Sequence, residues 1–437
     1  MIISKFSTNK KLLKTKLSVH KKIFDKKSCV KIYKLIKLSI VNNELTLTSI
    51  NSSIRHTSQL PLESSTGELD LAINTEMFCN IVDKIDGDIV NFESVEDTQI
   101  LTIFGTKSKN TLKSNDYFVN EFVIPAQNKD NQYCSFEIDT KKFITNTKKS
   151  FVCVGDPKTT YQLEFCNVCY TVDAINNTLV TVATDRFRIF RQESIINKLE
   201  YNQNNLNIRN EDEINYRLKE IKAQCKSSNI ERTDKEILES IIKDNAVYNN
   251  FVLPPKTLKI LLSAISKTDK LQISFNTDFA YFTFGNDTII LSYGVGRFPN
   301  YNKIIPAEFN YKFKINRLDF VDAFNQVSTV SNLDKVNQRT KLNFNLSSNN
   351  VKVEAEYTDI DKNHNYSEAS FTLDNLGDNK ESYQQLFNNS YITDYLSTLD
   401  CEFILWEHNT GKLALITPIY DNQNDKESEM YLSGGVK

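Results

Sequence analysis

Hydrophobic and polar residues alternate in six short runs along this chain, and each run leads into a residue that favours the start of a helix. Two clear copies are Leu71-Ala-Ile-Asn74 and Phe136-Glu-Ile-Asp139. In both, a half-buried strand is followed by a side chain that accepts hydrogen bonds from the free N–H groups of a helix. The six expected capping positions, in chain order, are Asn9, Asn74, Asp139, Pro254, Asn316 and Asn389. The pattern therefore predicts six strand-to-helix units.

The units recur at a nearly regular interval. Successive capping positions are about 65 residues apart, and only the interval from Asp139 to Pro254 is clearly longer, by about 50 residues. A period of this length is too long for a solenoid repeat and indicates a small αβ subdomain. The 437-residue length favours about three domains. We therefore expect two units in each domain.

Between the expected helices lie further alternating runs bounded by Asn, Asp, Gly and Ser, as is typical of antiparallel strands with one solvated face. These runs are residues 44–49, 100–104, 179–184, 271–275, 280–284, 342–346, 351–355 and 412–416. Few helices among many strands predict an α+β fold in which two helices per domain pack on antiparallel sheets.

Proline-ended runs suggest the domain boundaries. The segments 122–125, 303–306 and 415–418 are expected to be strands, and the first two each close a pair of repeats. The predicted domains are therefore residues 1–127, 128–306 and 307–437. The excess length falls at about 193–248, which is rich in Asn, Glu and Lys and is expected to be a surface insertion with helices at 213–223 and 234–244.

The formal net charge of −2 would normally argue against a nucleic-acid partner. However, the first 40 residues contain twelve lysines and a single acidic residue, Asp25. Basic residues recur on the expected helices, where a solvated face is the simplest explanation for any one helix. Recurrence in equivalent elements instead favours a sequence-independent track for phosphates. The residues expected to form it are Lys10, Lys14, Lys21, Lys141, Lys142, Lys148, Lys149, Lys256, Lys259 and Arg317.

No pattern of catalytic or metal-binding residues is apparent. Cys166 and Cys169 have zinc-like spacing but lack a second pair, so two buried cysteines are the favoured interpretation. The four histidines are scattered. We therefore expect a protein that is not an enzyme and that needs no cofactor or metal.

Cysteine usage indicates the compartment. Eight cysteines occur without regular spacing, and no secretory segment or membrane-length apolar run is present. We expect a cytoplasmic protein with no membrane partner.

Two segments carry a family resemblance. Thr181-Val-Ala-Thr-Asp-Arg-Phe-Arg-Ile189 resembles the "TVATDGHRLA" segment of the bacterial DNA polymerase III beta subunit, the replicative sliding clamp. Gly294-Val-Gly-Arg-Phe-Pro-Asn-Tyr-Asn-Lys-Ile-Ile-Pro306 is similar to that family's "GRFPDYRRVLP" segment. Residues 391–418 are similar to its last helix and hairpin. With the sixfold repeat, the resemblance covers the whole chain except residues 193–248.

The resemblance implies three tandem clamp-type domains and a homodimer that closes a six-domain ring around duplex DNA, with helices lining the hole. It also implies a non-catalytic processivity factor that contacts double-stranded DNA without sequence preference, the replicative DNA polymerase and an ATP-dependent clamp loader. A ring retains DNA by topology, so weak positive charge suffices.

The family also binds partner peptides in an apolar pocket. Carried over position by position, its residues are Leu163, Thr184, Arg186, Phe187, Arg188, Ile189, Pro299, Lys303, Ile304, Leu432, Gly434 and Val436. Such a pocket suits an aliphatic or aromatic anchor side chain. Two departures imply an altered pocket floor: Arg186-Phe187 replaces the family's Gly-His, and the C-terminal run is Ser433-Gly-Gly-Val-Lys437.

Two other functions are compatible with the sequence. The chain could be a clamp paralogue that acts as a protein scaffold without encircling DNA. It could also be an unrelated β-rich enzyme, although the six matched helix starts and the lack of catalytic clusters argue against this.

Overall fold

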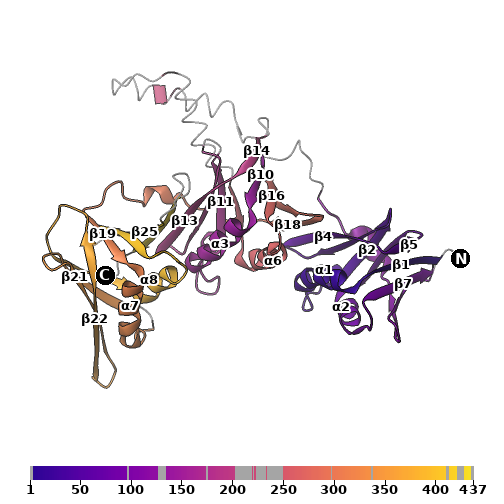
Figure 1. Cartoon of the computed structure of the whole chain (residues 1–437), viewed down its shortest axis with the longest axis horizontal. Coiled ribbons are helices and arrows are strands. Elements are labelled where there is room, and N and C mark those ends of the chain that lie inside the picture. The colour runs from indigo at the N-terminus through magenta and orange to yellow at the C-terminus, as the bar shows by residue number, and fades with distance from the viewer. Residues whose placement is uncertain are drawn as a thin grey trace. The chain divides into compact units, whose positions relative to one another are not determined.

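The computed structural model describes residues 3–95, 98–125, 134–173, 176–201, 219, 221–222, 233, 250–296, 298–335, 338–409, 413–420 and 428–434. The chain forms two compact units. The N-terminal unit comprises Met1–Ile144 and Ile196–Tyr293, and the C-terminal unit comprises Thr145–Ile195 and Gly294–Lys437. Six α-helices accompany many strands in the described residues (Figure 1), so the predicted α+β class is confirmed.

The N-terminal unit contains two sheets. The smaller has the order β5 (Ser64–Thr66), β1 (Ile3–Asn9), β7 (Ile89–Val95), β8 (Ile100–Phe104) and β9 (Lys109–Lys113). The larger has the order β14 (Asn197–Tyr201), β10 (Cys134–Asp139), β16 (Lys270–Phe275), β17 (Phe279–Phe284), β18 (Asp287–Ser292), β4 (Ile54–Pro61), β3 (Glu44–Ile50), β2 (Leu35–Val41) and β6 (Leu69–Asn74).

Two helices of this unit share one core with both sheets. They are α1 (Lys10–Ile23) and α2 (Thr75–Lys84), and their buried residues belong to the same apolar cluster as buried residues of β1, β2, β3, β6, β7 and β8. Phe6 stacks on Phe92 with ring centroids 4.5 Å apart, and Phe78 lies 6.2 Å from Phe92. Helix α6 (Pro255–Ile265) follows β15 (Asn250–Leu253) and packs against α1.

A pairing between β4 and β18 makes the larger sheet continuous. Its register runs from Asp287 opposite Ser58 to Leu291 opposite Ile54. Lys16 of α1 lies above this seam, and its Nζ donates to Asp287 Oδ1 at 2.6 Å. The seam therefore joins segments from the first and third hundred residues of the chain into one folded unit.

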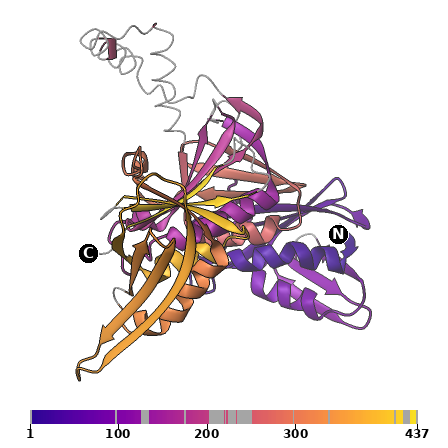
Figure 2. The same cartoon turned by 60° about the vertical axis from the view of Figure 1, so that its left-hand side comes forward.

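The C-terminal unit is built on one long antiparallel arrangement. Its strands follow the order β11 (Val168–Asp173), β12 (Thr178–Thr184), β13 (Arg188–Ile195), β26 (Glu429–Gly434), β25 (Leu413–Ile419), β24 (Phe403–His408), β19 (Tyr311–Asn316), β22 (His364–Asn375), β21 (Asn350–Thr358), β20 (Arg339–Asn345) and β23 (Tyr383–Asn388). Helices α7 (Arg317–Ser331) and α8 (Asn389–Leu396) belong to this unit, and α7 lies along β21 and β22 (Figure 2). Helix α3 (Thr140–Ser150) begins in the N-terminal unit and ends in the C-terminal one.

All six predicted strand-to-helix units are present. Asn9 accepts a hydrogen bond from the N–H of Leu12, at 3.1 Å, and Asp139 accepts one from Lys142, at 2.9 Å. Asn74 and Asn316 cap α2 and α7 in the same way, and Pro254 precedes α6 with a second proline at its first position. The repeated local signal thus determines where each helix begins.

The sixth capping residue was predicted one position too late. The cap is Asn388, whose side chain accepts from the N–H of Tyr391 at 3.2 Å. Asn389 is instead buried, and its amide donates to the carbonyl of Phe324 and to Thr340. Tertiary hydrogen bonds therefore decide between two adjacent asparagines.

The described parts of the alternating runs form strands as predicted, and the observed strand ends differ from the predicted ones by up to three residues. Of the three proline-ended runs, only the last is a strand, within β25. The first follows the 3₁₀ helix Asp116–Glu121, and the second begins on the last residue of the 3₁₀ helix Tyr301–Lys303, so both strand predictions were wrong. Neither run has a partner strand in the described structure, whereas Pro418 of β25 lies opposite Ile404 of β24.

The predicted insertion began too early, because Ile195 still belongs to β13 and residues 197–201 form β14. The helices expected at 213–223 and 234–244 lie almost entirely outside the described residues. The boundaries at 127 and 306 remain a prediction. None of the described helices has the length and apolar character needed to span a membrane.

A buried histidine pair lies beside the β4–β18 seam. The rings of His20 and His56 stack with centroids 4.2 Å apart. His20 exchanges hydrogen bonds with Ser49 (2.9 Å) and Ser58 (2.8 Å), whereas neither ring nitrogen of His56 has a partner in the described structure. Burial lowers the pKa of both histidines, that of His56 to about 3 with help from Lys16.

These depressed pKa values make the N-terminal unit sensitive to acid. Unfolded histidine titrates near 6.5, so below that pH the unfolded chain binds more protons than the folded one, and stability falls from about pH 6.5 towards pH 3. At pH 5 the loss from His56 is about 2 kcal/mol. We expect His56→Leu to flatten the dependence of calorimetric stability on pH between 7 and 5. The matched variant His364→Leu, at an exposed site, should keep the pH dependence of stability of the wild type. If His56→Leu kept it as well, burial of His56 would not be the cause of the acid sensitivity.

Candidate functional site

A small apolar cavity of about 150 Å³ lies in the C-terminal unit, where the end of β12, the start of β13 and the strands β25 and β26 meet residues 299–304. Its lining residues are Phe165, Thr184, Arg186, Phe187, Arg188, Ile189, Pro299, Tyr301, Ile304, Leu413 and Leu432. Ile189 and Leu432 face each other across the β13–β26 pairing and are 5% and 1% exposed. Phe187 and Ile304 are 57% and 52% exposed. The cavity thus has a buried floor and accessible apolar walls.

A tight turn between β12 and β13 shapes one wall. The Asp185 carboxylate accepts from the N–H groups of Phe187 and Arg188, at 3.0 and 3.1 Å. The N–H of Arg186 donates to Thr184 Oγ1 at 3.1 Å, and Arg186 has a φ of +82°. A left-handed φ is uncommon for a residue with a side chain, and the Asp185 hydrogen bonds hold the turn in this conformation.

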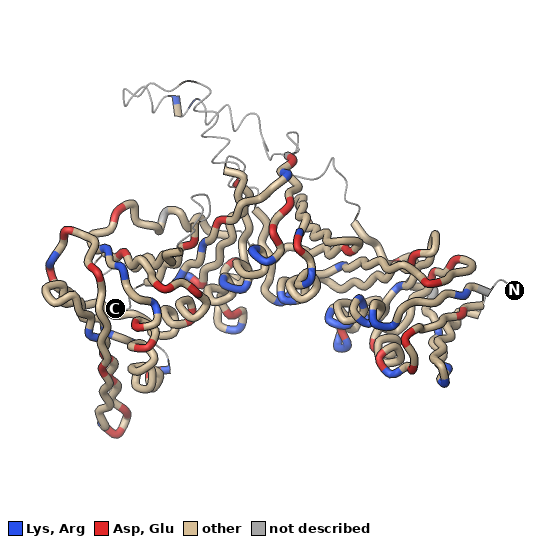
Figure 3. The backbone as a smooth tube through the Cα atoms, viewed as in Figure 1, with Lys and Arg blue, Asp and Glu red and all other residues tan. Residues whose placement is uncertain are grey.

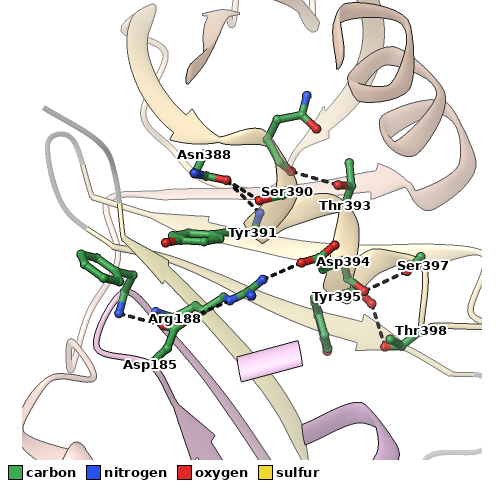
Figure 4. Close-up of polar contacts among 12 residues, drawn as sticks. Asp185, Arg188, Asn388, Ser390, Tyr391, Thr393, Asp394, Tyr395, Ser397 and Thr398 are labelled. Atoms are coloured by element: carbon green, nitrogen blue, oxygen red, sulfur yellow. Dashed lines mark hydrogen bonds and ion pairs between the residues drawn. The ribbon is translucent and has the colours of Figure 1, made fainter. Parts of the chain in front are cut away.

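Arg188 connects this turn to helix α8 (Figure 4). Its Nε lies 3.0 Å from Asp185, and its Nη1 lies 3.0 Å from Asp394. The guanidinium also lies over the ring of Tyr391, 4.5 Å from the centroid. Two carboxylates and an aromatic face therefore neutralise and orient Arg188, whose side chain is 12% exposed.

Helix and loop contacts hold the opposite wall. Asn167 Nδ2 donates to the carbonyls of Leu163 (2.9 Å) and Val295 (3.3 Å), which ties the 3₁₀ helix Leu163–Cys166 to the segment after β18. Tyr301 lies in the 3₁₀ helix Tyr301–Lys303, and burial raises the pKa of its hydroxyl. These contacts place Phe165 and Pro299 at the cavity.

A buried ion pair holds the start of β26. Lys149 Nζ lies 2.8 and 3.0 Å from the carboxylate oxygens of Glu429, and the Tyr395 hydroxyl donates to that carboxylate at 3.0 Å. The Lys149 and Glu429 side chains are 10% and 2% exposed. Tyr395 in turn stacks on Tyr431, with centroids 4.2 Å apart, so the polar cluster and the cavity floor share one strand.

The predicted pocket residues therefore fall into two groups. Eight of them line the cavity together: Thr184, Arg186, Phe187, Arg188, Ile189, Pro299, Ile304 and Leu432. Leu163 is 43% exposed and lies two residues before the lining residue Phe165. Gly434 donates its N–H to the Phe187 carbonyl at 2.9 Å without lining the cavity. Lys303 lies in a 3₁₀ helix, its side chain is not described, and Val436 lies outside the described residues.

Sequence reasoning missed three lining residues, Phe165, Tyr301 and Leu413. Phe165 and Tyr301 lie in 3₁₀ helices, which leave no clear periodic signal. Leu413 pairs with Gly434 across β25 and β26. Pairing the last two strands from the sequence could therefore have revealed it.

Lys and Arg residues lie on several helices (Figure 3), and several predicted phosphate contacts are exposed lysines of these helices. On α1, Lys14 and Lys21 are exposed, with Asp83 of α2 at 3.1 and 3.6 Å. Lys10 is half-buried and donates to the carbonyl of Ile85. The exposed lysines of α3 and α6 are Lys141, Lys142, Lys148, Lys256 and Lys259. Since α1 packs on α6, the N-terminal unit brings basic residues from neighbouring helices close together.

Two of the predicted contacts need correction. Lys149 is buried against Glu429 and is not available to a phosphate. Arg317 is half-buried; its Nε donates to the Cys401 carbonyl at 2.7 Å and its Nη1 to the Leu396 carbonyl at 3.4 Å. Both cations serve the interior of the C-terminal unit. In the sequence they were indistinguishable from solvated neighbours.

The cysteine pair expected to be buried is buried. Cys166 ends a 3₁₀ helix, and Cys169 lies in β11, where burial raises the pKa of its thiol to about 12. Within the described ranges, no three histidine, cysteine or acidic side chains are grouped as metal ligands would be.

Comparison with known proteins supports one class of fold. The beta clamp of Helicobacter pylori in complex with diflunisal matches with a TM-score of 0.76 and 18% identity, covering 99% of this chain and 100% of that chain. A DNA polymerase sliding clamp from Pseudomonas aeruginosa gives 0.74 and 16%, and the DNA polymerase III beta subunit of Thermotoga maritima gives 0.73 and 15%, each covering 99% of both chains. The fold is therefore that of three tandem clamp-type domains, each with two helices on antiparallel sheets.

Two family models match the sequence directly. The N-terminal domain of the DNA polymerase III beta subunit matches residues 4–124, and the C-terminal domain of that subunit matches residues 302–432. Together these ranges span more than half of the chain. No curated protein matches it. The chain belongs to the DNA polymerase III beta subunit family.

The Lys149–Glu429 pair should be a strong determinant of stability in the C-terminal unit. We expect Lys149→Met to cost about 3 kcal/mol, because it leaves the Glu429 charge buried without its cation. Adding Glu429→Gln should recover much of this loss, since glutamine still accepts from Tyr395. Urea unfolding followed by the fluorescence of Trp406, the single tryptophan and fully buried in this unit, measures each value.

The neighbouring exposed residue offers a matched control. Lys148→Met removes the same charge from the same helix and should change stability by less than about 0.5 kcal/mol. Equal losses in the two single variants would show that the ion pair contributes nothing specific.

Proposed function

We propose that this protein is a DNA sliding clamp, a non-catalytic processivity factor of the cytoplasm. Two copies would associate head to tail and close a six-domain ring around duplex DNA, opened for loading by an ATP-dependent clamp loader. The observation that carries the proposal is membership of the DNA polymerase III beta subunit family. The replicative polymerase and other partners would be tethered to the ring and held at the template.

Charge distribution supports contact with DNA that lacks sequence preference. The exposed lysines of α1, α3 and α6 are attached through flexible stems and suit phosphate oxygens better than base edges. Lys14 and Lys21 lie beside the Asp83 carboxylate, which weakens the net attraction. Weak attraction favours sliding, because a closed ring is retained by its topology.

The cavity supports tethering of a peptide. Its size suits one or two anchor side chains, its floor of Ile189 and Leu432 is apolar, and Ile304 and Phe187 are exposed beside it. A short peptide usually gains most of its affinity from one or two apolar side chains that are buried in such a cavity.

A closed ring around DNA should behave differently from a protein that binds DNA without encircling it. We expect a dimer in sedimentation and, after loading with the cognate loader and ATP, retention on closed circular DNA but rapid loss from linear DNA. Blocking both ends of the linear DNA with bulky protein should restore retention, since the ring can leave only by sliding off. A monomer, or equal loss from all three substrates, would favour a scaffold that does not encircle DNA.

The cavity can be tested without disturbing the core. Ile304→Asn replaces an exposed apolar wall with a polar side chain, and we expect it to weaken binding of a peptide from the replicative polymerase at least tenfold, about 1.4 kcal/mol. Isothermal titration calorimetry gives the dissociation constants. The matched control is Ile360→Asn, at a 97% exposed residue of the same unit, which should bind as the wild type does. Unchanged affinity in Ile304→Asn would place the peptide elsewhere.

A further inference from the structure

Arg186 is an unusual residue for its position at the cavity. It has a φ of +82°, a conformation in which a side chain normally costs free energy. The cost is tolerated because Asp185 and Thr184 fix the turn around it through three backbone hydrogen bonds. The chain thus keeps an arginine at a place where the backbone favours glycine.

The surroundings of Arg186 hold its guanidinium at the cavity. Nη1 donates to Gln162 Oε1 at 3.1 Å, and the guanidinium carbon lies 5.7 Å from the Phe165 ring centroid and 5.9 Å from that of Phe187. Both rings line the cavity. Aromatic faces therefore flank the cation and leave its remaining edge for other acceptors.

The charged side chains that line the cavity carry a net positive charge. The described lining residues with charged side chains are Arg186 and Arg188, and no carboxylate lines the cavity with them. Arg188 is compensated by Asp185 and Asp394. For Arg186, the described structure provides a neutral amide and no carboxylate within ion-pair distance.

Building on the proposed function, we propose that Arg186 selects partner peptides that carry an aspartate or glutamate directly beside the hydrophobic anchor. A peptide whose anchor occupies the floor at Ile189 and Leu432 must place the neighbouring residue at the wall, where Arg186 lies. A side-chain carboxylate there accepts two parallel N–H bonds from the guanidinium, whereas the equivalent amide accepts from it only through one oxygen. Arg186 is thus a specificity-determining residue of the cavity.

The test uses capped peptide pairs that differ by one charge. The two aspartate peptides are Ac-Gly-Asp-Leu-Phe-Gly-NH₂ and Ac-Gly-Leu-Phe-Asp-Gly-NH₂. Each is compared with the same peptide in which asparagine replaces aspartate, and titration calorimetry on the full-length protein gives the dissociation constants. We expect one aspartate peptide to bind about fivefold more tightly than its asparagine counterpart at low salt, and less than about twofold more tightly near 0.5 M salt. Arg186→Gln should abolish the preference, so that each aspartate peptide binds with the same affinity as its asparagine counterpart. Arg186→Lys should retain part of the preference.

The outcomes separate this proposal from the peptide site itself. Equal binding of each pair, with both peptides lost in Ile304→Asn, would overturn the role of Arg186 and leave the site intact. Failure of every peptide to bind the wild type would overturn both. Trp406 fluorescence should report the same unfolding midpoint for Arg186→Gln and the wild type, which shows that a lost preference comes from the charge.

Discussion

The pairing of β13 with β26 is the interaction on which the C-terminal unit and its cavity depend. Five residue pairs, from Arg188 opposite Ser433 to Gln192 opposite Glu429, set the register. Because side chains alternate along a strand, a slip of one residue would turn Leu432 away from Ile189 and remove Glu429 from Lys149. The apolar floor and the buried ion pair are therefore two results of one register, and neither could be kept while the other was lost.

Dependence on residues that are distant in sequence also explains which parts of the fold could be predicted from the sequence. Helix starts at Asn9, Asn74 and Asp139 were predicted correctly, because each capping side chain and the N–H group that donates to it lie within three residues of each other. The choice of Asn388 over Asn389 depended on Phe324 and Thr340, which are remote in sequence. Likewise, the runs that end at Pro125 and Pro306 are mainly apolar, as buried strands are, but lack partner strands in the described structure, and apolar character alone cannot supply a partner.

The candidate cavity was partly readable for a similar reason. The contiguous segment from Thr184 to Ile189 makes one wall, so a single motif located it. Lys149 could not be assigned in this way, because its partner Glu429 lies 280 residues away and an unpaired surface lysine has the same local pattern. Arg317 was misjudged likewise, since its acceptors are backbone carbonyls of Leu396 and Cys401. Charged residues gain their roles from distant partners, which sequence periodicity does not record.

The seam between β4 and β18 has a consequence for the protein during its synthesis. Lys16 and Asp287, which meet there, are 271 residues apart in the chain. At about 5–20 residues per second, the ribosome needs on the order of 10 to 50 seconds to supply the second partner. During that time β4 presents an open edge of backbone donors and acceptors, which invites pairing with other nascent chains. Closely spaced ribosomes on one messenger RNA should therefore promote aggregation of the nascent chains. Chaperones that cover the β4 edge during synthesis should increase the yield of folded protein.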